Sequence, residues 1–230
     1  MKKLFIITAF SLAVAATTSC GRSGCANEDN LFLQSENTKV IPDSALNSIG
    51  QLLDYFQAAY CGNGETSYPV IYYDLKKQEI VSTNGRNVIP VPVEPVICAG
   101  QPEYDFNRIL EIMLDGNNIL VEGIRMPADS IPQYVYYQYL SFGKKTGFSQ
   151  SPQGNGIWLI SEIQRPVKDF DKIIGRIIRG YIETAGIFCD AIYDKKICDL
   201  TAEELKSFKR QMQFHLAFKF NNEVKMEIEM

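Results

Sequence analysis

Hydrophobic and polar positions follow two different periods along the chain, and together these periods predict an α+β fold. Between residues 170 and 182, apolar residues recur every three or four positions while charged residues occupy the opposite face. The same register continues through Cys189 and Ile192, so the pattern predicts one long helix that contains Gly186. Near the C-terminus, four apolar residues alternate with other residues between Phe214 and Phe220, which is the period of a half-buried strand.

The central part of the chain adds a hairpin, a helix and another strand. Apolar runs at 108–114 and 119–123 flank the turn sequence DGNN, a pattern typical of a hairpin. A helix is expected to follow Asp129, and residues 157–164 predict a strand. The sequence TAEE at 201–204 is a capping box that begins a further helix. For residues 103–220 we therefore expect a small mixed sheet with helices packed on one face, in the order β-β-α-β-α-α-β, followed by a tail at 221–230.

A smaller helix-plus-hairpin region is expected at residues 43–86. Apolar residues at helical spacing begin after Asp43, which is a suitable N-cap, and two β-rich runs at 69–75 and 78–83 form the expected hairpin. Residues 87–102 contain four prolines, each of which lacks a backbone N–H for a strand ladder. We therefore expect an extended linker or edge at 87–102 and place a domain boundary there.

The first 19 residues are typical of a secretory signal, with two lysines followed by a 13-residue apolar run. The sequence TTSC that ends at Cys20 resembles the lipobox of bacterial lipoproteins, in which the cysteine is diacylated and becomes the mature N-terminus. Thr17 departs from the leucine that lipoboxes usually prefer. The resemblance implies a membrane anchor through diacylglyceryl Cys20 and a location in the bacterial cell envelope, periplasmic or on the outer-membrane surface. Residues 20–42 are then a lipidated N-terminus and flexible tether; the alternative is a secreted protein with a chance cysteine.

Charge and cysteine content narrow the function classes further. The net charge of -4 gives no basic footprint, so no nucleic-acid partner is expected. An exported chain permits disulfides, and Cys189 with Cys198 is the most local pair, although a small buried side chain is as good an interpretation of each. No CxxC spacing occurs, so neither a metal site nor a redox motif is expected.

No catalytic residue or cofactor is expected from the motifs present. The single histidine, His215, falls on the predicted C-terminal strand, and no GxSxG, HExxH, GxGxxG or P-loop sequence occurs. A rival hypothesis is a secreted hydrolase or carbohydrate-active lipoprotein that uses His215 with carboxylates. It requires His215 to lie in a cleft within reach of a carboxylate or hydroxyl.

Tyrosines in the sequence YVYYQY form the candidate binding surface. Tyr136, Tyr137 and Tyr139 present flat apolar faces and hydroxyls suited to a peptide, a sugar or a peptidoglycan strand. The alternative is that these tyrosines only rim the core. A surface glycan- or peptide-binding lipoprotein would need a concave aromatic pocket here, and the strand 214–219 offers an edge for a partner or for a homodimer.

The order of the C-terminal elements resembles the periplasmic domain of the ExbD and TolR family. The likeness is carried by residues 108–126, with their apolar hairpin and LVEG exit, by 157–185, and by the extended tail 191–218. It implies the fold above and an association with an ExbB/ExbD/TonB-type energy-transduction or envelope-maintenance system. Family members have a transmembrane helix with a proton-conducting aspartate, and this chain departs from that pattern. We therefore expect a non-enzymatic binding or accessory module that contacts an envelope protein or peptidoglycan.

Overall fold

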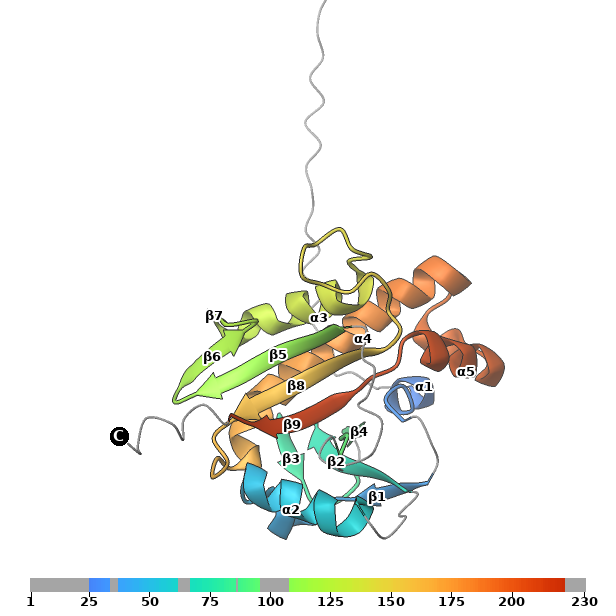
Figure 1. Cartoon of the computed structure of the whole chain (residues 1–230). Helices are drawn as coiled ribbons and strands as arrows, with labels where there is room; N and C mark the ends of the chain where they lie inside the picture. Colours follow the sequence, from blue (N-terminus) through green and yellow to red (C-terminus); the bar gives the residue numbers. More distant parts are fainter. Residues whose placement is uncertain (1–24, 34–36, 62–66, 86, 96–107, 222–230) are drawn as a thin grey trace, which may run out of the picture.

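The computed structural model describes residues 25–33, 37–61, 67–85, 87–95 and 108–221, and it confirms the α+β class. Two mixed sheets lie side by side, with the larger one formed by the C-terminal half of the chain (Figure 1). The expected signal sequence, Cys20 and the last nine residues fall outside the described part. Within the described part, no helix is both long enough and apolar enough to cross a membrane.

The larger sheet has the strand order β7-β6-β5-β8-β9. Its hairpin consists of β5 (Arg108–Asp115) and β6 (Asn118–Val121), and β7 (Ile124–Arg125) extends it at one edge. The strands β8 (Asn155–Ser161) and β9 (Leu216–Phe220) run parallel to β5. The turn at 116–117 is accommodated by Gly116, whose φ of 55° is readily adopted by glycine.

Two helices pack against each other on one face of this sheet: α3 (Ile131–Leu140) and α4 (Asp171–Tyr193) (Figure 1). Pro132 lies in the first turn of α3, where its missing N–H costs no helical hydrogen bond. The periodic apolar stripe of α4 is buried as predicted as far as Cys189, but Ile192 at its end is 56% exposed. Gly186 lies inside the helix. Gly180 lets the helices approach closely, because a Cβ there would lie 2.7 Å from the Cα of Pro132.

The helix α5 (Ala202–Gln211) confirms the predicted capping box. The Thr201 hydroxyl accepts a hydrogen bond from the Glu204 N–H, and the Glu204 carboxylate accepts one from the Thr201 N–H. These contacts satisfy backbone donors that the first turn of a helix leaves unpaired. The short 3-10 turns η2 (Ala128–Ser130), η3 (Val167–Phe170) and η4 (Ile197–Asp199) precede α3, α4 and α5 respectively.

The smaller sheet contains β1 (Thr38–Val40), β2 (Tyr68–Asp74), β3 (Glu79–Val81) and β4 (Val88–Pro92). Its helix α2 (Ile49–Tyr60) begins later than expected. Asp43 opens a 3-10 turn, η1 (Asp43–Leu46), and the N-cap of α2 is Ser48, whose hydroxyl accepts from the Gln51 N–H. The proline-rich segment supplies β4, which pairs with β2 alone, so its missing donors fall on an edge strand.

Residues 25–33 and 37–42 are part of the fold, whereas the sequence suggested a flexible tether over 20–42. The short helix α1 (Ala26–Asp29) lies beside η4, and β1 pairs in parallel with β2. Leu31 and Phe32 have no exposed surface, and the Phe32 ring contacts Tyr181 and Phe214. Burying two large apolar side chains stabilises this attachment by roughly 3–6 kcal/mol.

The hydrophobic core continues across the boundary expected at 87–102. One cluster of buried residues includes members of both sheets and all the longer helices. Polar contacts join the same parts: the Tyr73 hydroxyl of β2 donates to the Asp171 carbonyl, and the Asp171 carboxylate accepts from the Ile80 N–H of β3. The two sheets therefore share one core.

Candidate functional site

Two of the three predicted contact tyrosines lie on the outer side of α3. Tyr136 is 37% exposed, and Tyr137 is half-buried beside it, with ring centroids 5.8 Å apart. The Tyr137 hydroxyl accepts a hydrogen bond from the Gln133 side-chain amide at 2.7 Å. Because this contact fixes one ring, the surface is partly organised before any partner arrives.

Tyr139 does not belong to this surface, which corrects the sequence-based prediction. It is 1% exposed, its hydroxyl donates to the Gln213 carbonyl at 3.1 Å, and its ring packs against Tyr181. Burial raises the pKa of Tyr139 well above its ordinary value, so the hydroxyl stays protonated as a donor. Tyr139 falls one helical repeat after Val135 on the buried face of α3, so its role is in the core.

The loop after α3 extends the aromatic surface. The Phe148 ring lies 5.4 Å from the Tyr137 ring, and the Lys145 ammonium lies 5.2 Å from the centroid of the same ring. Phe142 is 53% exposed at the start of the loop. Together, Tyr136, Tyr137, Lys145 and Phe148 form what we call the α3 surface, which combines aromatic faces with one cation.

Two buried amides that the sequence did not single out hold this loop in place. The Asn155 amide nitrogen donates to the Gln138 and Ser151 carbonyls at 3.0 and 2.7 Å, and the Gln138 amide donates to the Arg108 carbonyl at 2.9 Å. Both side chains have no exposed surface. The loop contacts place Phe148 against α3, so these amides position the α3 surface without belonging to it.

His215 lies within reach of a carboxylate, which meets one of the two conditions of the enzyme hypothesis, the other being a cleft. Its Nδ1 is 2.8 Å from a carboxylate oxygen of Glu94, and its Nε2 is 3.2 Å from the Gln213 side-chain oxygen. The side chains of His215 and Glu94 are 15% and 4% exposed. Glu94 follows β4 and His215 precedes β9, so the pair joins segments 121 residues apart. Both ring nitrogens thus contact side chains of the protein itself.

Glu122, directly after β6, has a structural role. Glu122 has a φ of 52° and pairs with Arg108, and it also accepts from the Glu111 N–H at 2.9 Å. It therefore closes the β5–β6 hairpin and fixes the start of β5. A hollow of about 460 Å³ lies at the other end of this hairpin, at the β5–β6 turn. It is lined by residues 117–119 and 125–128 and by none of the tyrosines of the α3 surface.

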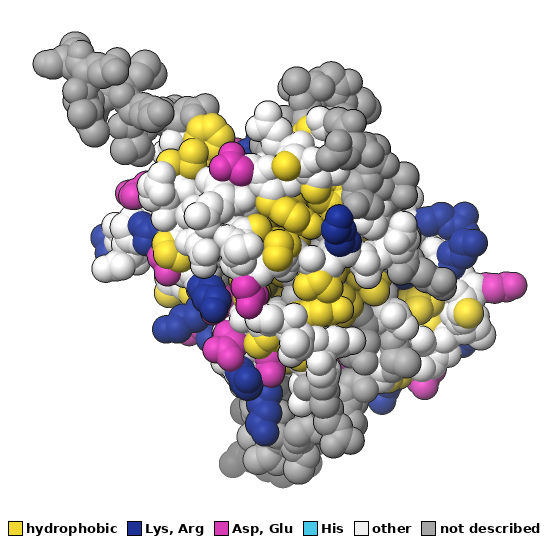
Figure 2. Space-filling model, turned by 90° about the horizontal axis from the view of Figure 1, so that it is seen from below, with side chains coloured by type: hydrophobic (Ala, Val, Ile, Leu, Met, Phe, Trp, Pro, Cys, Tyr) yellow, Lys and Arg dark blue, Asp and Glu magenta, His cyan; other side chains and the backbone are white. Residues whose placement is uncertain are grey.

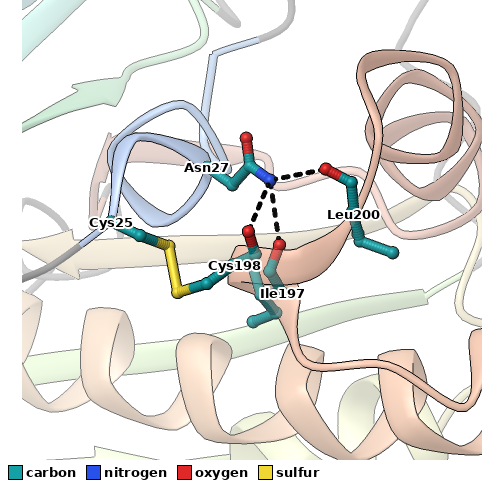
Figure 3. The surroundings of a disulfide bond; sticks show 5 residues. All are labelled: Cys25, Asn27, Ile197, Cys198 and Leu200. Carbon is teal, nitrogen blue, oxygen red and sulfur yellow. Dashed lines mark hydrogen bonds between the residues drawn. A yellow bond between two sulfur atoms is a disulfide. The ribbon is translucent and has the colours of Figure 1, made fainter.

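The disulfide connects residues far apart in sequence and differs from the predicted pair. Cys198 bonds to Cys25 across 173 residues (Figure 3). Cys189 is instead a buried free thiol. Burial raises the pKa of Cys189 to about 11, which leaves it protonated and unreactive. The Glu28 carboxylate lies near the two bonded sulfur atoms, but sulfurs held in a disulfide offer no thiolate to a metal ion.

The predicted edge at 214–219 is partly covered. β9 is the last strand of its sheet, but the Glu94 N–H donates to the Leu216 carbonyl at 2.7 Å. Leu216, Ala217 and Phe218 are buried, and α2 packs nearby. Strand addition at this edge would have to displace these contacts, so we do not place a homodimer there.

A second apolar surface lies on the side of the molecule that carries α2 and β1. Seen from below, this face has hydrophobic side chains near its middle and charged side chains mostly toward its periphery (Figure 2). In the smaller sheet, Tyr68 is 40% exposed. This face competes with the α3 surface as a place where a partner binds.

Comparison with known proteins identifies no relative. No family model, curated protein or solved structure matches the chain.

Proposed function

We propose that this chain is a lipid-anchored cell-envelope protein whose α+β body binds another envelope component without catalysing a reaction. The disulfide between Cys25 and Cys198 carries the proposal, because disulfides persist in oxidising compartments such as the bacterial periplasm. The N-terminal sequence supports export independently, with its basic start, its apolar run and Cys20 in a lipobox-like sequence. A diacylated cysteine supplies two acyl chains, which suffice for stable membrane attachment.

The α3 surface is the proposed contact with an envelope protein or a peptidoglycan strand. Exposed aromatic rings supply contact area at low entropic cost, and Lys145 adds a cation that would suit a carboxylate-bearing partner. Association with an ExbB/ExbD/TonB-type system belongs to this proposal and rests on the sequence resemblance alone.

Photo-crosslinking tests the binding surface in cells. A photoreactive phenylalanine analogue at Tyr136 should give a discrete adduct, while the same analogue at Lys206, on the exposed side of α5, serves as the matched control. An additional Tyr137→Ala change should weaken the adduct at position 136. Adducts of equal yield from positions 136 and 206 would reject the α3 surface. So would an adduct from the same analogue placed at Tyr68, on the second apolar surface, in the absence of one from position 136.

The anchor is tested separately by fractionation. Wild-type protein should partition with membranes, and a Cys20→Ala variant should be released, because the thioether requires the cysteine sulfur. Equal membrane association of the two forms would reject the anchor.

A hydrolase that uses His215 is the second candidate, favoured by its 2.8 Å contact with Glu94. A carboxylate in this place can orient an imidazole and stabilise its protonated form. The test compares wild type with a folded His215→Gln variant on ester and glycoside substrates. Turnover by wild type that disappears in the variant would establish the enzyme and overturn the non-catalytic proposal.

A further inference from the structure

We propose that the end of the body around Cys25 and Cys198 lies against the lipid headgroups, so that the membrane surface itself is the partner of this face. The inference rests on the lipid anchor proposed at Cys20. Beyond the anchor, we propose which face of the body lies at the membrane and how close to the headgroups it is held.

The short covalent path between the anchor and the body sets this distance. Cys25 follows Cys20 by five residues, and a fully extended chain of that length spans at most roughly 18 Å. The headgroup region of one leaflet takes up about 5–8 Å of this reach. A body of this size is roughly 40 Å across, so the remaining reach is much smaller than the body itself. A free tether extending to residue 42 would have allowed about 75 Å.

Three sets of contacts prevent Cys25 from leaving the body. The disulfide joins it to Cys198, and the Asn27 side chain donates to the Ile197 and Leu200 carbonyls at 3.0 and 2.9 Å (Figure 3). The fully buried Leu31 and Phe32 then continue the attachment into the core. The anchor therefore pulls on a rigid point, and the face around that point is held at the membrane.

The chemistry of this face suits contact with headgroups, but its described charged side chains provide no net positive charge to attract them. Ile192, in the last turn of α4, is 56% exposed and offers an apolar side chain. The exposed lysine at 196 is offset by nearby acids, and Lys195 already pairs with Glu204 at 2.7 Å. We therefore expect the orientation to come from the tether and to be insensitive to salt.

The opposite end of the body then faces away from the membrane. The β5–β6 turn lies at the far side of the molecule from α1 and α5 (Figure 1). This end carries the 460 Å³ hollow lined by residues that include Asn117 and Arg125.

Fluorescence quenching by brominated lipids tests the orientation on the full lipidated protein in vesicles. In a Trp158→Phe background, a tryptophan introduced by Lys196→Trp should lose emission in brominated vesicles. The matched Asn117→Trp variant, at the β5–β6 turn, should keep its emission. The same pattern should hold at high salt. Equal quenching of the two positions, or quenching of the Asn117→Trp variant alone, would overturn the proposal.

A spacer separates the geometric claim from the anchor itself. Twenty Gly/Ser residues inserted between Gly21 and Arg22 add roughly 25 Å of mean reach, so quenching of Lys196→Trp should fall while flotation with vesicles is retained. Quenching that the spacer leaves unchanged would also overturn the orientation. Protein that never floats would instead reject the lipid anchor. Hydrogen exchange provides a check without introduced tryptophans, by comparing unsubstituted protein on vesicles with the soluble Cys20→Ala form. On vesicles, residues 190–199 should exchange more slowly than in the soluble form, and residues 115–118 should exchange at the same rate in both.

Discussion

Two glycines of α4 should respond in opposite directions to the same substitution. Gly180 and Gly186 lie in one helix, so replacing either by alanine gains helix propensity worth about 1 kcal/mol. At Gly186 nothing lies within 4 Å of the new Cβ, and we expect the full gain. At Gly180 the Cβ would lie 2.7 Å from the Pro132 Cα and 3.1 Å from the Val135 Cβ.

The cost at Gly180 follows from what the new methyl group meets. The nearest atom belongs to the backbone of α3, so relief requires movement of a whole helix and not of a side chain. Overpacking of this kind costs about 1–3 kcal/mol, which equals or outweighs the gain in propensity. We therefore expect Gly180→Ala to lower the free energy of unfolding by up to about 2 kcal/mol.

Urea and thermal unfolding of the two variants, with disulfides intact, measure the difference. For a protein of this size, 1 kcal/mol corresponds to about 2–4 °C in Tm. The two variants differ by about 1–3 kcal/mol in stability, so their Tm values should lie about 2–12 °C apart. Crosslinking from Tyr136 should also weaken in Gly180→Ala, since α3 carries the α3 surface, and should be unchanged in Gly186→Ala. Equal stabilisation by the two substitutions would refute the close packing of α3 on α4.

Three further predictions concern charge and cysteine chemistry. His215→Ala should destabilise the protein by about 3 kcal/mol in urea unfolding, because it leaves the buried Glu94 carboxylate without the imidazole. A Glu94→Leu/His215→Ala double variant should recover part of this loss. A loss below about 1 kcal/mol in the single variant would show that the pair contributes little to stability. Burial raises the pKa of Asp171 from 3.8 to about 6, so between these pH values the folded state holds a proton that the unfolded chain has released. Stability, measured as the urea midpoint, should therefore fall as the pH rises from about 4 to 6, and Asp171→Asn should remove this fall. Urea midpoints of wild type and variant that fall in parallel over this range would contradict the prediction. Cys61 is disulfide-bonded, Cys25 pairs with Cys198, and Cys189 is a free thiol, so the partner of Cys61 is Cys98 if a lipid occupies the sulfur of Cys20. Mass spectrometry of a non-reduced digest should then detect a Cys61–Cys98 peptide. A Cys20–Cys61 peptide would rule out the anchor.

Local patterns predicted most of the C-terminal elements. The apolar stripe of α4 and the capping box of α5 are interactions between residues three or four apart, which the sequence displays directly. The same periodicity places Tyr139 on the buried face of α3 with Ile131 and Val135, so this error was avoidable. Tyr136 and Tyr137 fall outside that stripe, and they remain the proposed contacts.

Contacts between distant segments could not be predicted in this way. Cys198 had a local candidate partner in Cys189, but Cys189 continues the buried stripe of α4, and the actual partner is 173 residues away. The contact of Glu94 with His215 likewise depends on where two strands end in space. Residues 20–42 looked like a tether because they begin with small, polar residues, yet Leu31 and Phe32 fill a space in the core that only the assembled fold creates.

The lipid on Cys20 is the central claim, and the intact mass of protein extracted from membranes tests it most directly. The account predicts a chain that begins at Cys20, lacks residues 1–19 and carries a diacylglyceryl group on the cysteine sulfur. When the reduced protein is digested, the peptide that contains Cys20 should retain the lipid mass. A chain with an unmodified Cys20, or one that retains Met1, would contradict the anchor and with it the orientation of the body at the membrane.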